Sequence, residues 1–149
     1  MWGDLKRAAR LPGARRRLIG EALIALLIAR VAMAILPFRR IAAWLGTPGA
    51  ESSATASAEE IRTAQEVGWA VDAVARRVPW DGRCFAQALA ATWMLRRRGL
   101  EGTVSFGASQ GEFTGFDAHA WLRLGSFMVT GGPGHQRFKT FTTFSRRRP

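Results

Sequence analysis

Cysteine and histidine are scarce in this chain of 149 residues. It has one cysteine, Cys84, and two histidines, His119 and His135. A single cysteine excludes an internal disulfide, and these three side chains cannot complete a zinc site unless carboxylates join them. The sequence therefore predicts neither a metal centre nor another cofactor.

Acidic side chains are few relative to basic ones. The sequence contains 11 Asp and Glu residues and 22 Lys and Arg residues, which gives a net charge of +11. Such an excess favours acidic partners such as nucleic acid, anionic lipid or an acidic peptide. No recognised nucleic-acid-binding motif accompanies the charge, so we expect no nucleic-acid partner. A basic module that binds nucleic acid or a membrane surface without catalysis is the alternative to an enzyme.

The long apolar run at residues 18–36 contains no uninterrupted stretch of membrane-spanning length. Glu21 and Arg30 divide it, and the longest charge-free span, from Ala22 to Ala29, is eight residues, whereas a spanning helix needs about 20. We expect a helix that is buried on several sides or that lies against a membrane or partner surface. The expected location is cytoplasmic, with membrane association left open.

The order of sequence patterns predicts an α+β domain. A helix begins after Ser57, which with Glu60 forms a capping-box pattern. After Gly99 the apolar period changes from about 3.6 to 2, which predicts strands at 103–108, 117–125 and 127–132 and a further one at 137–144. The predicted organisation is an N-terminal helical segment (1–46), a linker (47–57) and a core (58–149).

Cys84 and His119 are the candidate catalytic residues. Cys84 lies in the first turn of a predicted helix that Asp81 can cap, and there the helix dipole favours the thiolate, the nucleophilic form. His119 lies in the middle of a predicted strand whose other face is apolar, and it is a candidate base. An inert buried cysteine and a structural histidine are the alternative interpretation.

Two segments carry a family resemblance. "CFAQALAATWMLRRRGLEGTVSFGAS" followed by "FDAHAWLRLGSFMVTGG" resembles the transglutaminase-like cysteine peptidases that mature lasso peptides, the B2 proteins of those gene clusters. The arginine-punctuated helical segment at the N-terminus and "RRVPW" before the cysteine agree, so the resemblance extends from about Arg16 to Gly132. It implies a papain/transglutaminase-like core, in which the cysteine-bearing helix packs on a small antiparallel sheet, preceded by N-terminal helices.

The resemblance also implies a reaction and its partners. Cys84 would attack a backbone carbonyl at the end of the leader of a lasso precursor peptide, and His119 would accept the thiol proton and pass it to the leaving amine. Water would then hydrolyse the thioester and free the core peptide for a separate lasso cyclase. The first 46 residues are expected to be helical, unlike a winged leader-binding module, so a separate leader-recognition protein (the B1 protein) is expected to deliver the leader. The same two residues could also serve acyl transfer to an amine.

The chain departs from the family at the third catalytic position. The family usually has an aspartate about a dozen residues after the histidine, where this sequence has "MVTGGPG" with Gly131 near the expected place. Asp117, two positions before His119, lies on the same face of a strand and could orient the imidazole. A backbone carbonyl or Thr130 could do so instead, and Asp117 could equally be a solvated strand-end acid. Gln87 and Trp121 are more plausibly structural, and His135 is expected to be exposed.

Overall fold

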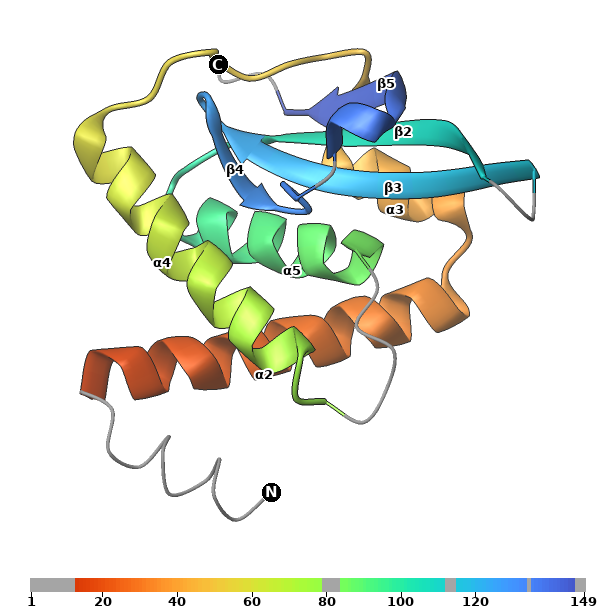
Figure 1. The fold of residues 1–149 in the computed structure, drawn as a ribbon. Coiled ribbons are helices and arrows are strands. Elements are labelled where there is room, and N and C mark those ends of the chain that lie inside the picture. Colours follow the sequence, from red (N-terminus) through yellow and green to blue (C-terminus); the bar gives the residue numbers. More distant parts are fainter. Residues whose placement is uncertain (1–12, 79–83, 112–114, 134, 147–149) are drawn as a thin grey trace.

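The computed structural model describes residues 13–78, 84–111, 115–133 and 135–146. Within these ranges the chain forms helices that are followed by an antiparallel sheet, which confirms the α+β class. The sheet lies on one side, α5 runs beneath it, and α2 lies beneath α5 (Figure 1). The helices are α2 (Gly13–Ile35), α3 (Phe38–Leu45), α4 (Ala58–Ala75) and α5 (Cys84–Arg97). The strands are β1 (Thr47–Pro48), β2 (Thr103–Gly111), β3 (Gly115–Leu124), β4 (Phe127–Thr130) and β5 (Lys139–Ser145), with a short 3-10 turn, η1 (His135–Arg137), before β5.

The five strands form one sheet in the order β1-β5-β2-β3-β4, and each neighbouring pair is antiparallel. The predicted alternation along β3 is borne out, because Ala120, Leu122 and Leu124 are buried towards the helices. Gly125 makes the turn into β4 with a φ of 58°, a backbone conformation that favours glycine.

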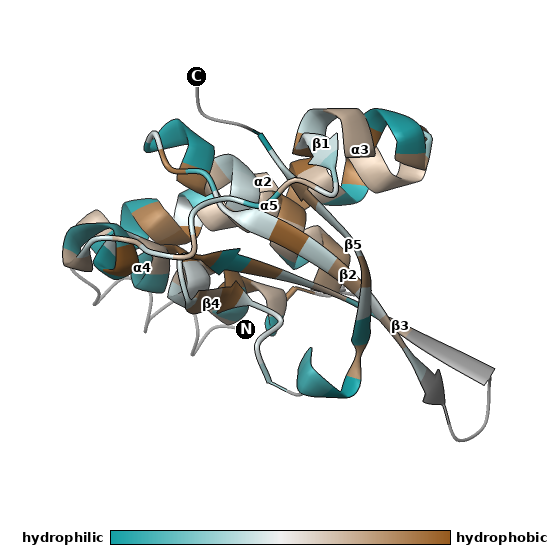
Figure 2. Cartoon of the chain, turned by 90° about the horizontal axis from the view of Figure 1, so that it is seen from above, coloured by the Kyte–Doolittle hydropathy of each residue, from teal (hydrophilic) through white to brown (hydrophobic). Residues whose placement is uncertain are grey.

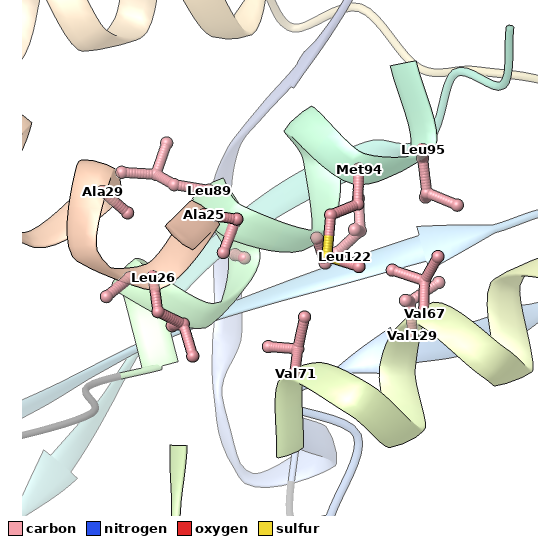
Figure 3. Close-up of a cluster of buried hydrophobic side chains, with 14 of the residues drawn as sticks. Ala25, Leu26, Ala29, Val67, Val71, Leu89, Met94, Leu95, Leu122 and Val129 are labelled. Atoms are coloured by element: carbon pink, nitrogen blue, oxygen red, sulfur yellow. The ribbon is translucent and has the colours of Figure 1, made fainter. Parts of the chain in front are cut away.

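The hydrophobic core lies between the sheet and the helices and continues between α5 and α2. Figure 3 shows the part of it that comes from α2, α4, α5, β3 and β4, and residues of α3, β2 and β5 also contribute. Helix α4 alternates hydrophobic and hydrophilic residues along its length, as expected for a helix with one face on the core (Figure 2). Several of the core side chains are fully buried: Leu26, Val67, Val71, Met94, Leu95 and Leu122.

Helix α5 lies at the centre of the fold because much of its surface is made of small residues. Ala88 and Ala91 are completely buried, which lets the helix approach its neighbours closely. At its C-terminal end Arg96 donates hydrogen bonds to the carboxylate of Glu101 and to backbone carbonyls of α3. Gly99 follows with a φ of 73°, a left-handed conformation that is common for glycine just after a helix.

The segment before α4 is attached to the sheet. β1 pairs with β5, and the side chain of Ser52 hydrogen-bonds to that of Thr103 over 2.7 Å. The capping interaction of α4 is confirmed: Oγ of Ser57 accepts a hydrogen bond from the backbone N–H of Glu60 at 3.1 Å. Residues 47–57, predicted as a linker, therefore hold the helical segment and the sheet together.

Helix α2 is buried on one side. Its inward residues are Ala22, Ala25, Leu26 and Ala29, and they pack against α4 and α5. The opposite side exposes large aliphatic side chains. By length and composition alone α2 could cross a membrane, a test that a core helix of a soluble protein or a signal sequence also passes.

Candidate functional site

Cys84 is the first residue of α5 and so lies in the first turn of a helix, where the sequence predicts it; its side chain is half-buried. Four of the first eight residues of the helix are alanines. Alanine has the highest helix propensity, and its small side chain lets the helix pack closely against its neighbours. The predicted cap, Asp81, and the neighbouring Arg83 lie outside the described residues. The thiol therefore stands at the tip of the central helix of the fold.

His119 lies in the middle of β3, opposite Gly107 on β2, and is half-buried. Its Nε2 is 2.7 Å from the carbonyl oxygen of Gly131. Because a carbonyl only accepts hydrogen bonds, Nε2 must carry the proton of this bond. Nδ1 of the neutral ring is then the basic nitrogen.

Aromatic rings enclose the imidazole of His119. Trp121, on the same side of β3, stacks at a ring-centre distance of 5.7 Å, and Phe138 lies at 4.8 Å. Gly107 makes room for both, because a Cβ at this position would lie 2.8 Å from Cβ of Phe138 and 2.8 Å from Cη2 of Trp121. The imidazole is thus held by one hydrogen bond and two flanking rings.

His135 belongs to the same cluster, which sequence reasoning missed. It is half-buried, so the expectation that it is exposed was wrong. Its Nδ1 is 2.7 Å from the carbonyl oxygen of Gly132, and its ring centre is 5.7 Å from that of Trp121. The "GG" at 131–132 was visible in the sequence, but nothing in a linear pattern shows that its two carbonyls anchor two histidines.

Gly131 lies beside the imidazole, and it is the residue near which the resemblance predicts an aspartate. A Cβ at this position would be 3.1 Å from Nε2 of His119 and 2.6 Å from the carbonyl oxygen of Ala120. The φ of Gly131 is 70°, which disfavours a side chain. In this chain the hydrogen-bond partner of Nε2 is the backbone carbonyl of Gly131.

Asp117 and Thr130 are the other candidates for orienting the imidazole of His119. Asp117 lies in β3 and pairs with Ser109, but its side chain is outside the described part of the chain, so its role stays a prediction. Oγ1 of Thr130 is buried and has no hydrogen-bond partner among the described residues. Thr130 therefore does not hold the imidazole.

The two faces of the sheet separate Cys84 from His119. Phe106 contacts Phe85, the neighbour of Cys84 on α5, at a ring-centre distance of 5.2 Å, so Phe106 and its partner Ala120 face the helices. The next pair, Gly107 and His119, must face the other way, because successive residues of a strand alternate. Within the described ranges no hydrogen bond joins Sγ of Cys84 to His119, and their catalytic pairing stays a prediction.

The edge of β3 near His119 offers a route between the two faces. β4 pairs with β3 over Leu122–Leu124, so the preceding residues of β3 extend past the paired part of β4. Gly131 approaches His119 at this edge, and Gln87, one turn after Cys84, is half-buried on α5. A Cys–His mechanism requires a movement that brings the tip of α5 to the imidazole at this edge.

The described residues contain no group of three or more His, Cys, Asp and Glu side chains that could hold a metal ion. The reactive groups they offer are one thiol at a helix tip and two histidines anchored to glycine carbonyls. These groups suit nucleophilic and acid–base chemistry.

Comparison with known proteins places the chain in a family. Neither the curated proteins nor the solved structures include a significant match. The family model of the transglutaminase-like superfamily matches residues 23–143, which include part of α2, Cys84, His119 and most of β5. Because this match covers most of the sequence, the chain belongs to the transglutaminase-like superfamily.

Proposed function

We propose that this protein is a cysteine peptidase that removes the leader from a lasso precursor peptide. One observation carries the proposal: the family match encloses a thiol at a helix N-terminus and a histidine whose Nε2 is held by the Gly131 carbonyl. Members of this superfamily are often cysteine peptidases or transferases. The narrower assignment to lasso peptides is supported by the cysteine followed by "FAQALAA" and by "AHAW" on the histidine strand.

The proposed reaction uses the two nitrogens of His119 for different tasks. Nε2–H stays bonded to the Gly131 carbonyl and keeps the ring in one tautomer. Nδ1 takes the proton from the thiol of Cys84, and Sγ forms a bond to the carbonyl carbon at the end of the leader. When the tetrahedral intermediate breaks down, the C–N bond cleaves and Nδ1 gives its proton to the leaving amine of the core peptide.

Water completes the cycle. Nδ1 accepts a proton from water as the oxygen attacks the thioester, and the thiol of Cys84 leaves with that proton while the leader departs as a carboxylic acid. The Trp121 and Phe138 rings pack against the imidazole, which stays half-buried and accessible to the attacking water. The reaction needs Sγ of Cys84 and Nδ1 of His119 within hydrogen-bonding distance. The bound precursor must therefore stabilise an arrangement in which the tip of α5 lies next to the imidazole at the edge of β3.

A separate leader-recognition protein is part of the proposal. The described N-terminal residues form helices α2 and α3, which pack into the core and leave no winged leader-binding module between residues 13 and 46. The recognition protein would present the leader, and a lasso cyclase would take over the freed N-terminus. We expect slow cleavage by this chain alone and faster cleavage when the recognition protein is added.

The test is leader removal from a lasso precursor, followed by mass spectrometry, with the recognition protein present. We expect wild type to release leader and core peptide and Cys84→Ala to release neither. His135→Ala is the matched control, because a glycine carbonyl also anchors His135, through Nδ1 instead of Nε2, and His135 has no role in the proposed steps. Leader release by Cys84→Ala at the wild-type rate would rule out nucleophilic catalysis at this position.

Acyl transfer is the second candidate, because the superfamily includes transferases. The two reactions share the thioester and differ in whether water or an amine attacks it. Adding a small primary amine to the cleavage assay separates them: a transferase gives a leader amide, whereas a peptidase gives the free acid.

A further inference from the structure

The exposed large apolar side chains of this protein are concentrated on one surface. Eight of the ten in the described residues lie between Leu23 and Phe38, and the other two are Trp69 and Phe141. Single exposed apolar residues are ordinary, but a contiguous group marks an interaction site. We call the exposed side of α2, together with the first turn of α3, the α2 surface.

Helix α2 buries three alanines and one large residue, Leu26, and exposes most of its other large aliphatic residues. Ala22, Ala25 and Ala29 are at most 5% exposed, whereas Ile24 and Ile28 are 55% and 54% exposed. A helix stabilised by burial in a soluble protein alone would have the larger aliphatic side chains facing the core. The outward side of α2 is therefore built for an apolar environment outside this chain.

Arginines flank this apolar side. Arg16 and Arg17 precede Leu23 and Ile24 by seven residues, two helical turns, so each pair shares a side of the helix. Arg30 lies among the aliphatic residues, Arg39 and Arg40 begin α3, and all five arginines are exposed.

Negative charge is almost absent from this region. Glu21 is the only acidic residue between positions 13 and 50. It is bonded to Arg98 at 2.7 Å and lies 3.8 Å from Arg97, both on α5. These ion pairs direct the Glu21 carboxylate towards α5. The α2 surface therefore combines aliphatic side chains with arginines and has no free carboxylate to repel an anionic partner.

The same surface contains a hollow of about 320 Å³ between α2, α3 and α5. Its lining is mostly apolar and includes Ile28, Leu36, Trp44, Leu89 and Trp93, with Arg40 as the charged residue. A flexible aliphatic chain with a negatively charged head suits this combination.

We propose that the α2 surface binds the surface of an anionic lipid bilayer. α2 lies in the plane of the membrane, its aliphatic side chains enter the boundary between headgroups and acyl chains, and its arginines contact lipid phosphates. The helix cannot cross the bilayer, because its alanine side stays packed against α4 and α5. Of the eight exposed large apolar residues of the α2 surface, seven are Leu, Ile or Val and one, Phe38, is aromatic. Protein interfaces are enriched in Tyr, Trp, Phe, Met and Arg, so the α2 surface shares their arginines but has a more aliphatic composition.

This orientation leaves the candidate site open to water. α2 and the sheet lie on opposite sides of α5 (Figure 1), and the face of the sheet with His119 points away from the helices. A protein bound through α2 would thus present its histidine face to soluble partners.

The test is flotation of the full chain with vesicles of phosphatidylcholine alone and of phosphatidylcholine mixed with phosphatidylglycerol. We expect binding to the mixed vesicles and its loss at high salt, which screens the arginines. Ile24→Glu should weaken binding at least tenfold, and Arg16→Gln and Arg39→Gln about fivefold each. Phe141→Glu is the matched control: Phe141 is 65% exposed but lies on β5, so binding should not change.

Three results would overturn the proposal. They are no flotation with mixed vesicles, equal binding to both kinds of vesicle, and equal losses in Ile24→Glu and Phe141→Glu. A dimer in solution that Ile24→Glu dissociates, in a protein that does not float, would show that a second copy covers this surface. Melting curves identify a variant that fails to fold, and the two arginine variants then decide. Vesicle binding does not depend on peptidase activity, so this proposal and the proposed function can fail separately.

Discussion

The inner face of the sheet and its outer face carry different kinds of side chain, although they alternate along the same strands. The inner face packs Val104, Leu122 and Leu124 against the helices. The outer face carries Gly107, whose missing side chain makes space, and the ring cluster around His119. One-residue alternation therefore separates residues that stabilise the fold from residues that are available for chemistry, and substitutions on the two faces should separate unfolding from cleavage.

The largest expected effect is on catalysis at the outer face. His119→Ala removes the proposed base, and we expect leader cleavage to fall roughly 10³-fold, about 4 kcal/mol in activation free energy. The melting temperature should change little, because the ring is half-buried and loses one hydrogen bond. Rates of precursor cleavage measured beside His135→Ala test this, and equal losses in the two variants would contradict the assignment of His119 as the base.

Leu122→Ala should have the largest effect on stability. Leu122 is fully buried on the inner face, and truncation of such a leucine costs about 3 kcal/mol. Urea denaturation gives the free energy of unfolding. The same substitution at Leu27, which is 48% exposed on α2, should change it by less than about 0.5 kcal/mol. Similar losses at both positions would mean that the packing in Figure 3 is not the source of stability.

Gly107→Ala tests the space beneath the ring cluster. The added methyl group would lie 2.8 Å from both Phe138 and Trp121, and overpacking of this kind costs about 2 kcal/mol. Gly20→Ala is the matched control, because a Cβ there meets nothing within 4 Å and alanine favours the helix by up to about 1 kcal/mol. Thermal unfolding of the two variants should shift in opposite directions, and an unchanged Gly107→Ala would show that the rings give way freely.

The smallest effect is expected from the ion pair that joins α2 to α5. The hydrogen bond from Arg98 holds the pKa of Glu21 below its ordinary value, so the pair stabilises the fold fully above the unfolded pKa and is lost as pH falls through the folded pKa. Glu21→Gln should lower the free energy of unfolding by about 1 kcal/mol at pH 7 and by less at pH 3. Asp72→Asn breaks an exposed pair with Arg76 and should have almost no effect. A loss from Glu21→Gln that is the same at both pH values would contradict the electrostatic origin.

Much of the fold follows from local patterns. The N-cap at Ser57 and the alternation of β3 were each predicted and are each observed, because they depend on residues close together in the chain. The same reasoning placed Cys84 at a helix start and His119 in mid-strand. It did not predict the attachment of residues 47–57 to the sheet, since the bond between Ser52 and Thr103 joins residues 51 positions apart.

The candidate site was predicted less completely than the fold. Spacing identified a thiol and an imidazole, and the resemblance supplied a family that the comparison confirms at the level of the superfamily. The anchoring of His119 to Gly131 and of His135 to Gly132 depends on where β4 ends relative to β3. Turn geometry and the hydrophobic pattern set the register of such a hairpin, but the register shift between Leu122 and Arg123 was not predicted from the sequence.

The amino-acid sequence by itself determined which segments are helical or extended, where several of them end and which residues could be nucleophile and base, because propensity, capping and periodicity act over a few residues. Only the tertiary structure decided that His119 is held by a backbone carbonyl, that its ring leaves the sheet on the face away from α5, and that α2 turns its alanines inwards. These features arise when distant segments pack together, since close packing selects one arrangement among the many that local preferences allow.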